Sequence, residues 1–576
     1  MISDFLNQSY VLAQARAQRD WLNDLRTKAK AKRPAALAAL KKHGVTARQI
    51  ETAIAALNAA LATAKRSKRG SDTAFLPSIP ILCAFQMGMT QMADRRANTV
   101  SVPPAPAPVA RRVPSRSKGL RAPAVIDTSA TEHLKRRSDA GAITGPGRAV
   151  LKAPFVEGDD IHYGLDGFGA KFGALFKRHR KFNKNAAQPA VSTKPLRLFV
   201  FGDWGTGLPL AQRVTQQIRQ QIDAGDGTRQ QHVVHLGDVY YVGDSDEYSE
   251  RAIASGMWPV TGTERNTIGS WSLNGNHDMY VGGYGYFDKL LRDGRFLRWH
   301  RDASGEPSSF FVIEDAHWQF FGLDTAWNLP SLTSALFGDP TLNDYGGQNG
   351  ILTKEQVKWM AGQRDASKGC VLLTHHQPAA SRAGEGQHAD EAVKLLKKEG
   401  VYAQLDAWLW GHEHRCVVFK PKAQRTTPRL ADAPEFCACI GHGGVPVTAK
   451  NFAKNKKIAD VAWEEDRLDA TSPTYEGERI VPFGFARIDT APGALDIRIY
   501  DHSGSERYQT TFTRPGAVSA PIAAAKSPSR SLRRAVVTRT PSKPAKFFFR
   551  EHEENKTRTQ QAPLTTVTAN STPITP

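Results

Sequence analysis

Short apolar runs alternate with helix-like stretches between about residues 196 and 510. The apolar runs predict strands at residues 196–201, 232–236, 271–273, 309–313, 318–323, 371–374, 407–410 and 436–440. Amphipathic stretches predict helices at residues 209–223, 246–254, 283–293, 354–364 and 389–399. This alternation indicates an α/β domain over residues 196–510 with some antiparallel strands.

The sequence on either side of this domain has a different pattern. Residues 1–100 are rich in helix-forming residues, which predicts a basic helical region; its apolar positions at helical spacing include Ile50, Ile54, Leu57 and Leu61. Residues 101–195 are predicted to be a Pro-rich basic linker, mostly irregular. Residues 511–576 have little apolar content, and a basic disordered tail is expected there.

The net charge of +21 is spread unevenly along the chain. Residues 196–510 carry 33 Lys and Arg against 40 Asp and Glu, so the positive charge lies in the two flanks. A nucleic acid or another anionic partner is therefore a candidate for the flanks and not for the α/β domain.

The compartment is predicted from the cysteines and the N-terminus. The five cysteines are scattered and odd in number, unlike a disulfide framework. The N-terminus lacks the features of a signal peptide, and the most apolar early segment, residues 81–92, is too short to span a bilayer. We expect a cytoplasmic protein with no transmembrane segment.

Five of the predicted strands are followed directly by side chains of the kinds that bind metals. In chain order these are Asp203, Asp238, Asn276 with His277, His375 with His376, and His412 with His414. The C-terminal ends of parallel strands lie along one sheet edge, so we expect these side chains to converge. Their number exceeds the need of one ion and suits two ions of the first transition row, with one carboxylate as a bridge.

The motifs at these strand ends resemble those of a known family. They read GDWG at 202–205, GDVYY at 237–241, GNHD at 275–278, LLTH at 372–375 and GHEH at 411–414. This set resembles the calcineurin-like metallophosphoesterase superfamily, and its wording is closest to the purple acid phosphatases and related bacterial phosphohydrolases. The resemblance covers about residues 196–505 and implies a double β-sheet sandwich flanked by helices.

The resemblance also implies which residues hold the first ion. Position 205 is a glycine where many members of the superfamily have a histidine ligand. In purple acid phosphatases a tyrosine three residues after the second aspartate takes its place, which here is Tyr241. Asp203, His414 and the phenolate of Tyr241 are then expected at the first ion. The alternative is that Tyr241 is a core aromatic residue below the site.

For the second ion, the resemblance implies Asp238 as a bridge, with Asn276, His412 and one histidine of the adjacent pair as further ligands. The choice within the pair stays open. His375 directly follows the apolar run, whereas the spacing to Pro378 points to His376. We expect His375 to be the ligand, because a side chain at the strand end has the least freedom.

The catalytic roles follow from the same resemblance. His277 is expected to protonate the leaving group, with Asp278 orienting its imidazole. The nucleophile is expected to be a hydroxide that bridges the metals and whose pKa they lower. Arg382 and Arg415 are further candidates to meet the charge of the substrate.

Together these expectations predict a hydrolase acting on phosphate ester bonds, a binuclear metallophosphoesterase that favours small-molecule monoesters. A tyrosinate ligand favours Fe with a second divalent ion (Fe, Zn or Mn), and a Mn or Zn pair is the alternative. One alternative function is a phosphodiesterase or nuclease to which the basic flanks bring nucleic acid. The other is a non-catalytic binding protein with basic flanks.

Overall fold

The computed structural model describes residues 8–34, scattered positions between 37 and 61, and residues 180–240, 242–327, 349–383, 388–452, 456–475 and 478–516. The chain divides into two units, Met1–Pro521 and Ile522–Pro576, and the second lies outside the described residues. The same holds for most of the predicted linker, for the predicted tail beyond residue 516 and for Tyr241.

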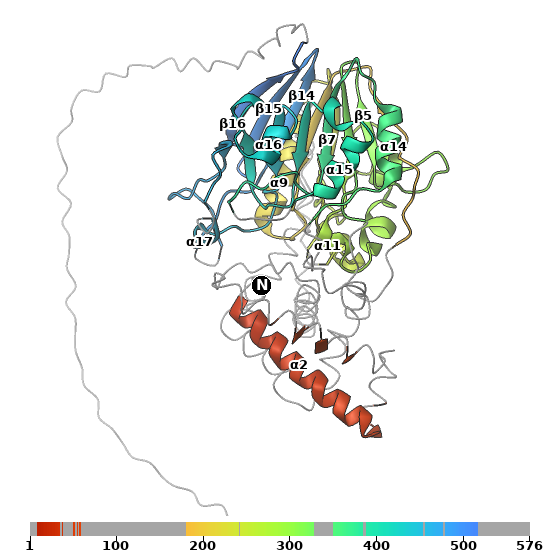
Figure 1. Ribbon diagram of the computed structural model, residues 1–576, viewed down its shortest axis with the longest axis vertical. Coiled ribbons are helices and arrows are strands. Elements are labelled where there is room, and N and C mark those ends of the chain that lie inside the picture. Colours follow the sequence, from red (N-terminus) through yellow and green to blue (C-terminus); the bar gives the residue numbers. More distant parts are fainter. Residues whose placement is uncertain are drawn as a thin grey trace, which may run out of the picture. The chain divides into compact units, whose positions relative to one another are not determined.

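Two β-sheets form the folded domain (Figure 1). The first has six strands in the order β16-β15-β14-β2-β3-β4. Their bounds are β2 (Leu196–Phe201), β3 (Gln230–His235), β4 (Gly269–Ser272), β14 (Gly484–Ala491), β15 (Ala494–Asp501) and β16 (Glu506–Thr513). β2, β3 and β4 are parallel, and Phe201 pairs with His235 and His235 with Ser272. The three strands therefore end at the same level.

The second sheet has eight strands in the order β1-β5-β6-β7-β8-β10-β9-β11. Their bounds are β1 (Ala190–Val191), β5 (Phe311–Glu314), β6 (Trp318–Gly322), β7 (Gly369–Thr374), β8 (Ala407–Trp410), β9 (Cys416–Phe419), β10 (Phe436–Ile440) and β11 (Val461–Glu464). β6, β7, β8 and β10 are parallel to one another. β12 (Thr474–Tyr475) and β13 (Glu478–Arg479) form a separate antiparallel pair.

Successive side chains along a strand belong to different layers of the hydrophobic core. Leu198 and Val200 of β2 belong to the central core with Trp271, Val371 and other buried residues of both sheets. Phe199 and Phe201 belong instead to the core on the outer face of the six-stranded sheet. Because successive side chains of a strand point to opposite faces, a strand covered on both sides is apolar at nearly every position.

Helices cover the outer face of each sheet. Those packed on the six-stranded sheet are α9 (Pro209–Asp223), α10 (Ser245–Arg251), the π-helix η1 (Tyr286–Leu290) and α12 (Gly294–His300). The eight-stranded sheet is covered by α14 (Lys354–Gln363) and α15 (Asp390–Lys398). Shorter elements are α11 (Asn276–Met279), η2 (Tyr402–Gln404), η3 (Lys422–Gln424), α16 (Pro428–Asp432) and α17 (Ala449–Phe452).

The expected double-sheet sandwich flanked by helices is confirmed. The folded part also extends further toward the N-terminus than the apolar pattern indicates. Phe182 and Ala187 are buried in the cores, and β1 pairs with β5 in the eight-stranded sheet. Residues from about 180 onward thus belong to the folded domain.

In the region predicted to be helical, the described residues include one long helix, α2 (Gln8–Lys30). Its Leu22 and Leu25 are buried, as are Ile50, Ile54, Leu57 and Leu61. Nζ of Lys30 lies 3.1 Å from a carboxylate oxygen of Glu51. Among the described residues, no helix combines the length and the apolar character needed to cross a membrane.

Candidate metal centre

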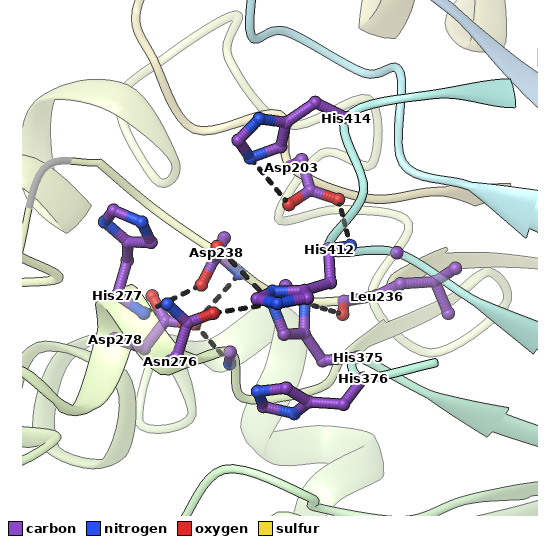
Figure 2. Close-up of polar contacts among 12 residues, drawn as sticks. Asp203, Leu236, Asp238, Asn276, His277, Asp278, His375, His376, His412 and His414 are labelled. Atoms are coloured by element: carbon purple, nitrogen blue, oxygen red, sulfur yellow. Dashed lines mark hydrogen bonds and ion pairs between the residues drawn. The ribbon is translucent and has the colours of Figure 1, made fainter. Parts of the chain in front are cut away.

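Side chains from five strand ends meet at one edge of the sandwich (Figure 2). Asp203 follows β2, Asp238 follows β3, and Asn276 begins α11 after β4. His375 follows β7 of the other sheet, and the remaining two histidines, His412 and His414, follow β8. Each sheet therefore supplies about half of the predicted metal ligands.

The first group of side chains surrounds the hydroxyl of Tyr240. This oxygen lies 2.9 Å from Oδ1 of Asp203, 3.1 Å from Oδ2 of Asp238 and 3.0 Å from Nε2 of His414. Nε2 of His414 is also 3.5 Å from Oδ1 of Asp203. Both carboxylates and the phenol are fully buried, while about a quarter of the His414 side chain is exposed.

The second group is centred on His375. Its Nδ1 lies 2.9 Å from the carbonyl oxygen of Leu236, so in the neutral ring this nitrogen carries the proton and Nε2 has a free lone pair. Nε2 faces three atoms: Oδ1 of Asn276 at 3.1 Å, Oδ2 of Asp238 at 3.4 Å and Nδ1 of His412 at 3.2 Å. Atoms bearing lone pairs thus converge from four strand ends.

The two adjacent histidines have different surroundings. His375 faces Asp238 and Asn276, as described above. Nδ1 of His376 instead lies 2.8 Å from the hydroxyl of Thr325. The rings of His376 and His412 are 4.8 Å apart, and the three histidines are close enough to share an ion. Of the two, His375 is the one that contacts Asp238 and Asn276, and its predicted ligation stays a prediction.

The backbone is strained where it presents these side chains. Asp203, Asp238, His412 and His414 all have positive φ, between 53° and 75°. Non-glycine residues rarely adopt this region, and such strain concentrates at functional sites. Gly275 is needed for a close approach, because a Cβ there would lie 2.1 Å from Oδ1 of Asp238.

The electrostatics of the cluster indicate a site for positive charge. Burial raises the pKa of Asp203 to about 8. Burial by itself would also raise the pKa of Asp238, but positive charge on His375 and His277 holds it well below the usual range. Against the effect of burial, Asp238 raises the pKa of His375 to about 9. A proton on His375 then supplies the positive charge that the carboxylates require.

His277 lies beside this cluster with its imidazole directed away from His375 (Figure 2). Its backbone N–H donates to Oδ1 of Asp238 at 3.0 Å. Its ring lies between two tyrosines, with ring centroids 4.6 Å from Tyr240 and 4.7 Å from Tyr280. The imidazole therefore adjoins the proposed ligands without facing the volume that they surround.

The contacts of Asp278 differ from the predicted role in orienting His277. Its carboxylate accepts hydrogen bonds from the backbone N–H groups of Gly275, Asp238 and Val239, at 2.7, 3.0 and 2.9 Å. It also accepts one from the hydroxyl of Tyr248 at 2.6 Å. A carboxylate has about four acceptor positions. With all four used, Asp278 fixes the loops after β3 and β4 and has no acceptor position left for an imidazole.

The aromatic hydroxyl at the first group belongs to Tyr240, a residue that the sequence did not single out as a ligand. Tyr241 lies outside the described residues, so its predicted ligation stays a prediction. The available signal was the adjacent pair of tyrosines that follows Asp238, a predicted metal ligand. Alternation along an extended strand would direct Tyr240 away from the site, but Asp238 has φ 75° and the strand has already ended there.

A comparison with protein families fits this geometry. Residues 196–416 match the family model of the calcineurin-like phosphoesterases. These residues form a calcineurin-like phosphoesterase domain. The match includes every one of the five strand ends described above. The family hydrolyses phosphate esters in a metal-dependent reaction, and the phosphoesterase domain of this chain offers two groups of side chains that suit metal ions.

The phosphoesterase domain is also similar to solved structures. One is GAP50, the anchor in the inner membrane complex of Plasmodium, with 13% identity over 56% of this chain and 89% of that chain and a TM-score of 0.36. Another is a dimetal phosphatase from Danio rerio, with 13% identity over 55% of this chain and 98% of that chain and a TM-score of 0.33. No curated protein matches the chain.

The side chains present suit resident metal ions. Ligand atoms bound to one ion at about 2.1 Å are separated from each other by roughly 3 to 3.4 Å. The separations around Nε2 of His375, 3.1 to 3.4 Å, lie in this range. The Nδ1–H of His375 points to a backbone carbonyl, and metal-binding histidines usually donate their second nitrogen in this way.

Proposed function

We propose that the phosphoesterase domain hydrolyses phosphate monoesters with two metal ions held at the strand ends. The observation that supports this proposal best is the convergence of lone pairs on Nε2 of His375. Asn276, Asp238 and His412 each direct such an atom toward it from a different strand end. Positive charge stabilises this arrangement, and a metal ion would supply it in place of the proton that His375 otherwise carries.

The ligands divide between the two ions as follows. The first ion would be held by Asp203, His414 and the hydroxyl of Tyr240. The second would be held by Asn276, His375 and His412, with Asp238 shared by both ions. The amide of Asn276 has its oxygen toward His375 because its nitrogen donates to the hydroxyl of Tyr280 at 2.8 Å.

The choice of metals depends on Tyr240. Burial raises the pKa of its phenol far above the ordinary value, and the carboxylates of Asp203 and Asp238 raise it further. Only a strongly acidic ion displaces this proton and binds the phenolate. We therefore propose Fe at the first position and a divalent Fe, Zn or Mn at the second, with a Mn or Zn pair as the alternative in which Tyr240 stays protonated.

The chemistry of the reaction divides between the ions and His277. Bound ions would neutralise the phosphoryl oxygens and lower the pKa of the attacking water. His277 would give a proton to the departing alkoxide; this role is supported by its ring, which adjoins the cluster, and by its backbone N–H, which donates to Asp238. Asp278 acts on the geometry of the loops and not on the proton.

Two multivalent ions balance the charge of a dianionic monoester better than that of a monoanionic diester, which favours monoesters. The test is a panel of mono- and diesters assayed with the full chain after chelation and reloading with Fe, Zn or Mn. Faster release of 4-nitrophenol from 4-nitrophenyl phosphate than from its bis ester is expected. Hydrolysis of neither ester with any ion would refute the proposed function.

The basic flanks support a second candidate function, a nuclease or phosphodiesterase. All the excess positive charge lies outside residues 196–510, where it would attract a nucleic acid backbone. If this function holds, the full chain cleaves single-stranded DNA or RNA, and residues 180–516 alone cleave it much more slowly. Equal rates for both proteins, or no cleavage, would exclude it.

A further inference from the structure

Three cationic side chains beside the proposed metal centre share one buried carboxylate, that of Glu464. Nη2 of Arg382 donates to Oε1 of Glu464. Nη1 of Arg415 lies 3.7 Å from the same oxygen, and Nζ of Lys457 lies 3.8 Å from Oε2. The exposed carboxylate of Asp466 is 4.0 Å from Lys457. The ion pairs of this cluster thus join three cations to one buried and one exposed carboxylate.

The cluster is held against the metal centre by the chain itself. Arg415 directly follows His414 in the chain. A short loop connects His375 to Arg382. This loop is tied to the other histidines, because the N–H and hydroxyl of Ser381 donate to Glu413 at 3.0 and 2.5 Å. Glu413 lies between His412 and His414.

The guanidinium of Arg382 has donors that its surroundings do not use. The residue is 3% exposed, and its Nε and Nη1 have no hydrogen-bond partner among the described residues. The faces of the Arg382 and Arg415 guanidiniums both lie 5.0 Å from the ring of Phe452. Stacking on Phe452 leaves the unused N–H groups of Arg382 available to another partner, and a buried donor without a partner is destabilising.

We propose that Arg382 and Arg415 form a subsite for a second oxyanion of the substrate, a phosphate or a carboxylate. Guanidinium groups bind such planar or tetrahedral oxyanions through paired N–H donors. The substrate class is then a phosphate ester that carries a second anionic group, with the scissile phosphate at the metal centre. This subsite rests on the proposed function, which places the first phosphate.

Binding of phosphonates tests the subsite without any turnover, because a C–P bond is not hydrolysed. The metal-loaded full chain is titrated by calorimetry with propylphosphonate, propane-1,3-diphosphonate and 4-phosphonobutyrate. We expect the diphosphonate, or both ligands with a second anionic group, to bind about tenfold or more tightly than propylphosphonate, as charge-assisted hydrogen bonds of this kind allow. If only the diphosphonate binds more tightly, the subsite selects a phosphate. If the diphosphonate and 4-phosphonobutyrate bind equally tightly, the subsite accepts oxyanions in general.

Variants decide whether the two arginines cause this preference. Arg415→Gln keeps the Arg382–Glu464 pair, so it is the variant expected to fold, and it should reduce the preference severalfold. Arg382→Gln should abolish it. The matched control is Arg197→Gln, which breaks an ion pair of Arg197 with Asp489 at the opposite end of β2 and should keep the full preference.

Two results would overturn the subsite: equal binding of all three ligands, or a preference that persists in Arg415→Gln as in Arg197→Gln. Hydrolysis of 4-nitrophenyl phosphate is measured on the same samples. A preference without hydrolysis would keep the subsite and refute the proposed function, whereas hydrolysis without a preference would do the reverse.

Discussion

The hydroxyl oxygen of Tyr240 lies 2.9 Å from Oδ1 of Asp203, although the two residues follow different strands. The backbone beside this contact explains why position 205 is a glycine. Gly205 forms a backbone bridge with Val239, and a Cβ at Gly205 would lie 2.7 Å from the Cα of Val239. A histidine has no room at this position, and the tyrosine next to Val239 reaches the same carboxylate.

Tyr240→Phe is expected to weaken binding at the first metal position about tenfold or more, because it removes one donor and keeps the ring. With iron bound, the wild type should show a visible tyrosinate-to-iron absorption band that the variant lacks. Metal content and absorption spectra measure both effects. Tyr286→Phe, which removes a hydroxyl bonded to the carbonyl of Ser272, should change neither. Loss of the band in Tyr241→Phe but not in Tyr240→Phe would show that Tyr241 is the ligand.

Asp238→Asn and His277→Ala should both lose hydrolysis for different reasons. Asp238 contacts both groups of proposed ligands, so its variant should bind less metal. His277→Ala should keep two ions per chain and lose about 10²- to 10⁴-fold in kcat, the usual contribution of a general acid. Metal analysis and steady-state kinetics separate these outcomes. A His277→Ala protein without metal would contradict the proposed division of roles.

Asp278→Asn should destabilise the fold as well as lower activity. The amide nitrogen of asparagine replaces an oxygen that accepts backbone N–H bonds, so at least one buried donor loses its partner. We expect the free energy of unfolding to fall by about 2 to 3 kcal/mol. Tyr248→Phe removes one of the four hydrogen bonds and should have a smaller effect of the same kind. If denaturation shows unchanged stability and only kcat falls, Asp278 acts on His277 after all.

Buried histidines outside the site predict loss of stability in acid. Burial lowers the pKa of His232 to about 3 and of His300 to about 4, from 6.5 in the unfolded chain. Between these values only the unfolded chain binds the protons. The stabilisation that comes from keeping these histidines neutral is therefore fully present above about pH 6.5. Below that pH, the free energy of unfolding falls by up to about 1.4 kcal/mol per pH unit for each histidine.

The measurement is urea denaturation, followed by tryptophan fluorescence, at pH 7, 6 and 5. His300 accepts from the N–H of Ser272 and donates to the carbonyl of Ser308, so His300→Gln lowers stability at every pH. Its stability should nevertheless change less between pH 7 and 5 than that of the wild type. Equal changes in both proteins would show that His300 does not cause the acid sensitivity.

The strands that carry the site were predictable because they are covered on both faces. β8 and β10 are continuous apolar runs, β2 is apolar except for Arg197, and all three have the predicted bounds. β14 to β16 were missed because polar residues interrupt them. β15 nevertheless alternates, with Leu495, Ile497 and Ile499 buried, so a usable signal was present. In β16 most side chains are at least partly exposed, and the apolar pattern is correspondingly weak.

The strand ends predicted which residues meet, but not how each one is used. Polar residues directly after an apolar strand mark the edge of a sheet. This pattern predicts that Asp203, Asp238 and His375 lie at that edge, as they do in the structure, but it does not predict their side-chain contacts. The resemblance to purple acid phosphatases assigned the tyrosine ligand to Tyr241, which lies outside the described residues, and the positive φ of Asp238 is the backbone feature that strand alternation could not anticipate for Tyr240. The role of Asp278 depends on three backbone N–H groups, which no side-chain pattern reveals.

The most direct test of the proposed function is the rate of 4-nitrophenyl phosphate hydrolysis by the metal-stripped full chain as metal is added back. We predict almost no hydrolysis by the stripped protein and a rate that reaches its plateau when two ions are bound per chain. A rate unaffected by chelation, or a plateau at one ion per chain, would contradict a two-metal site built from Asp203, Asp238 and His375.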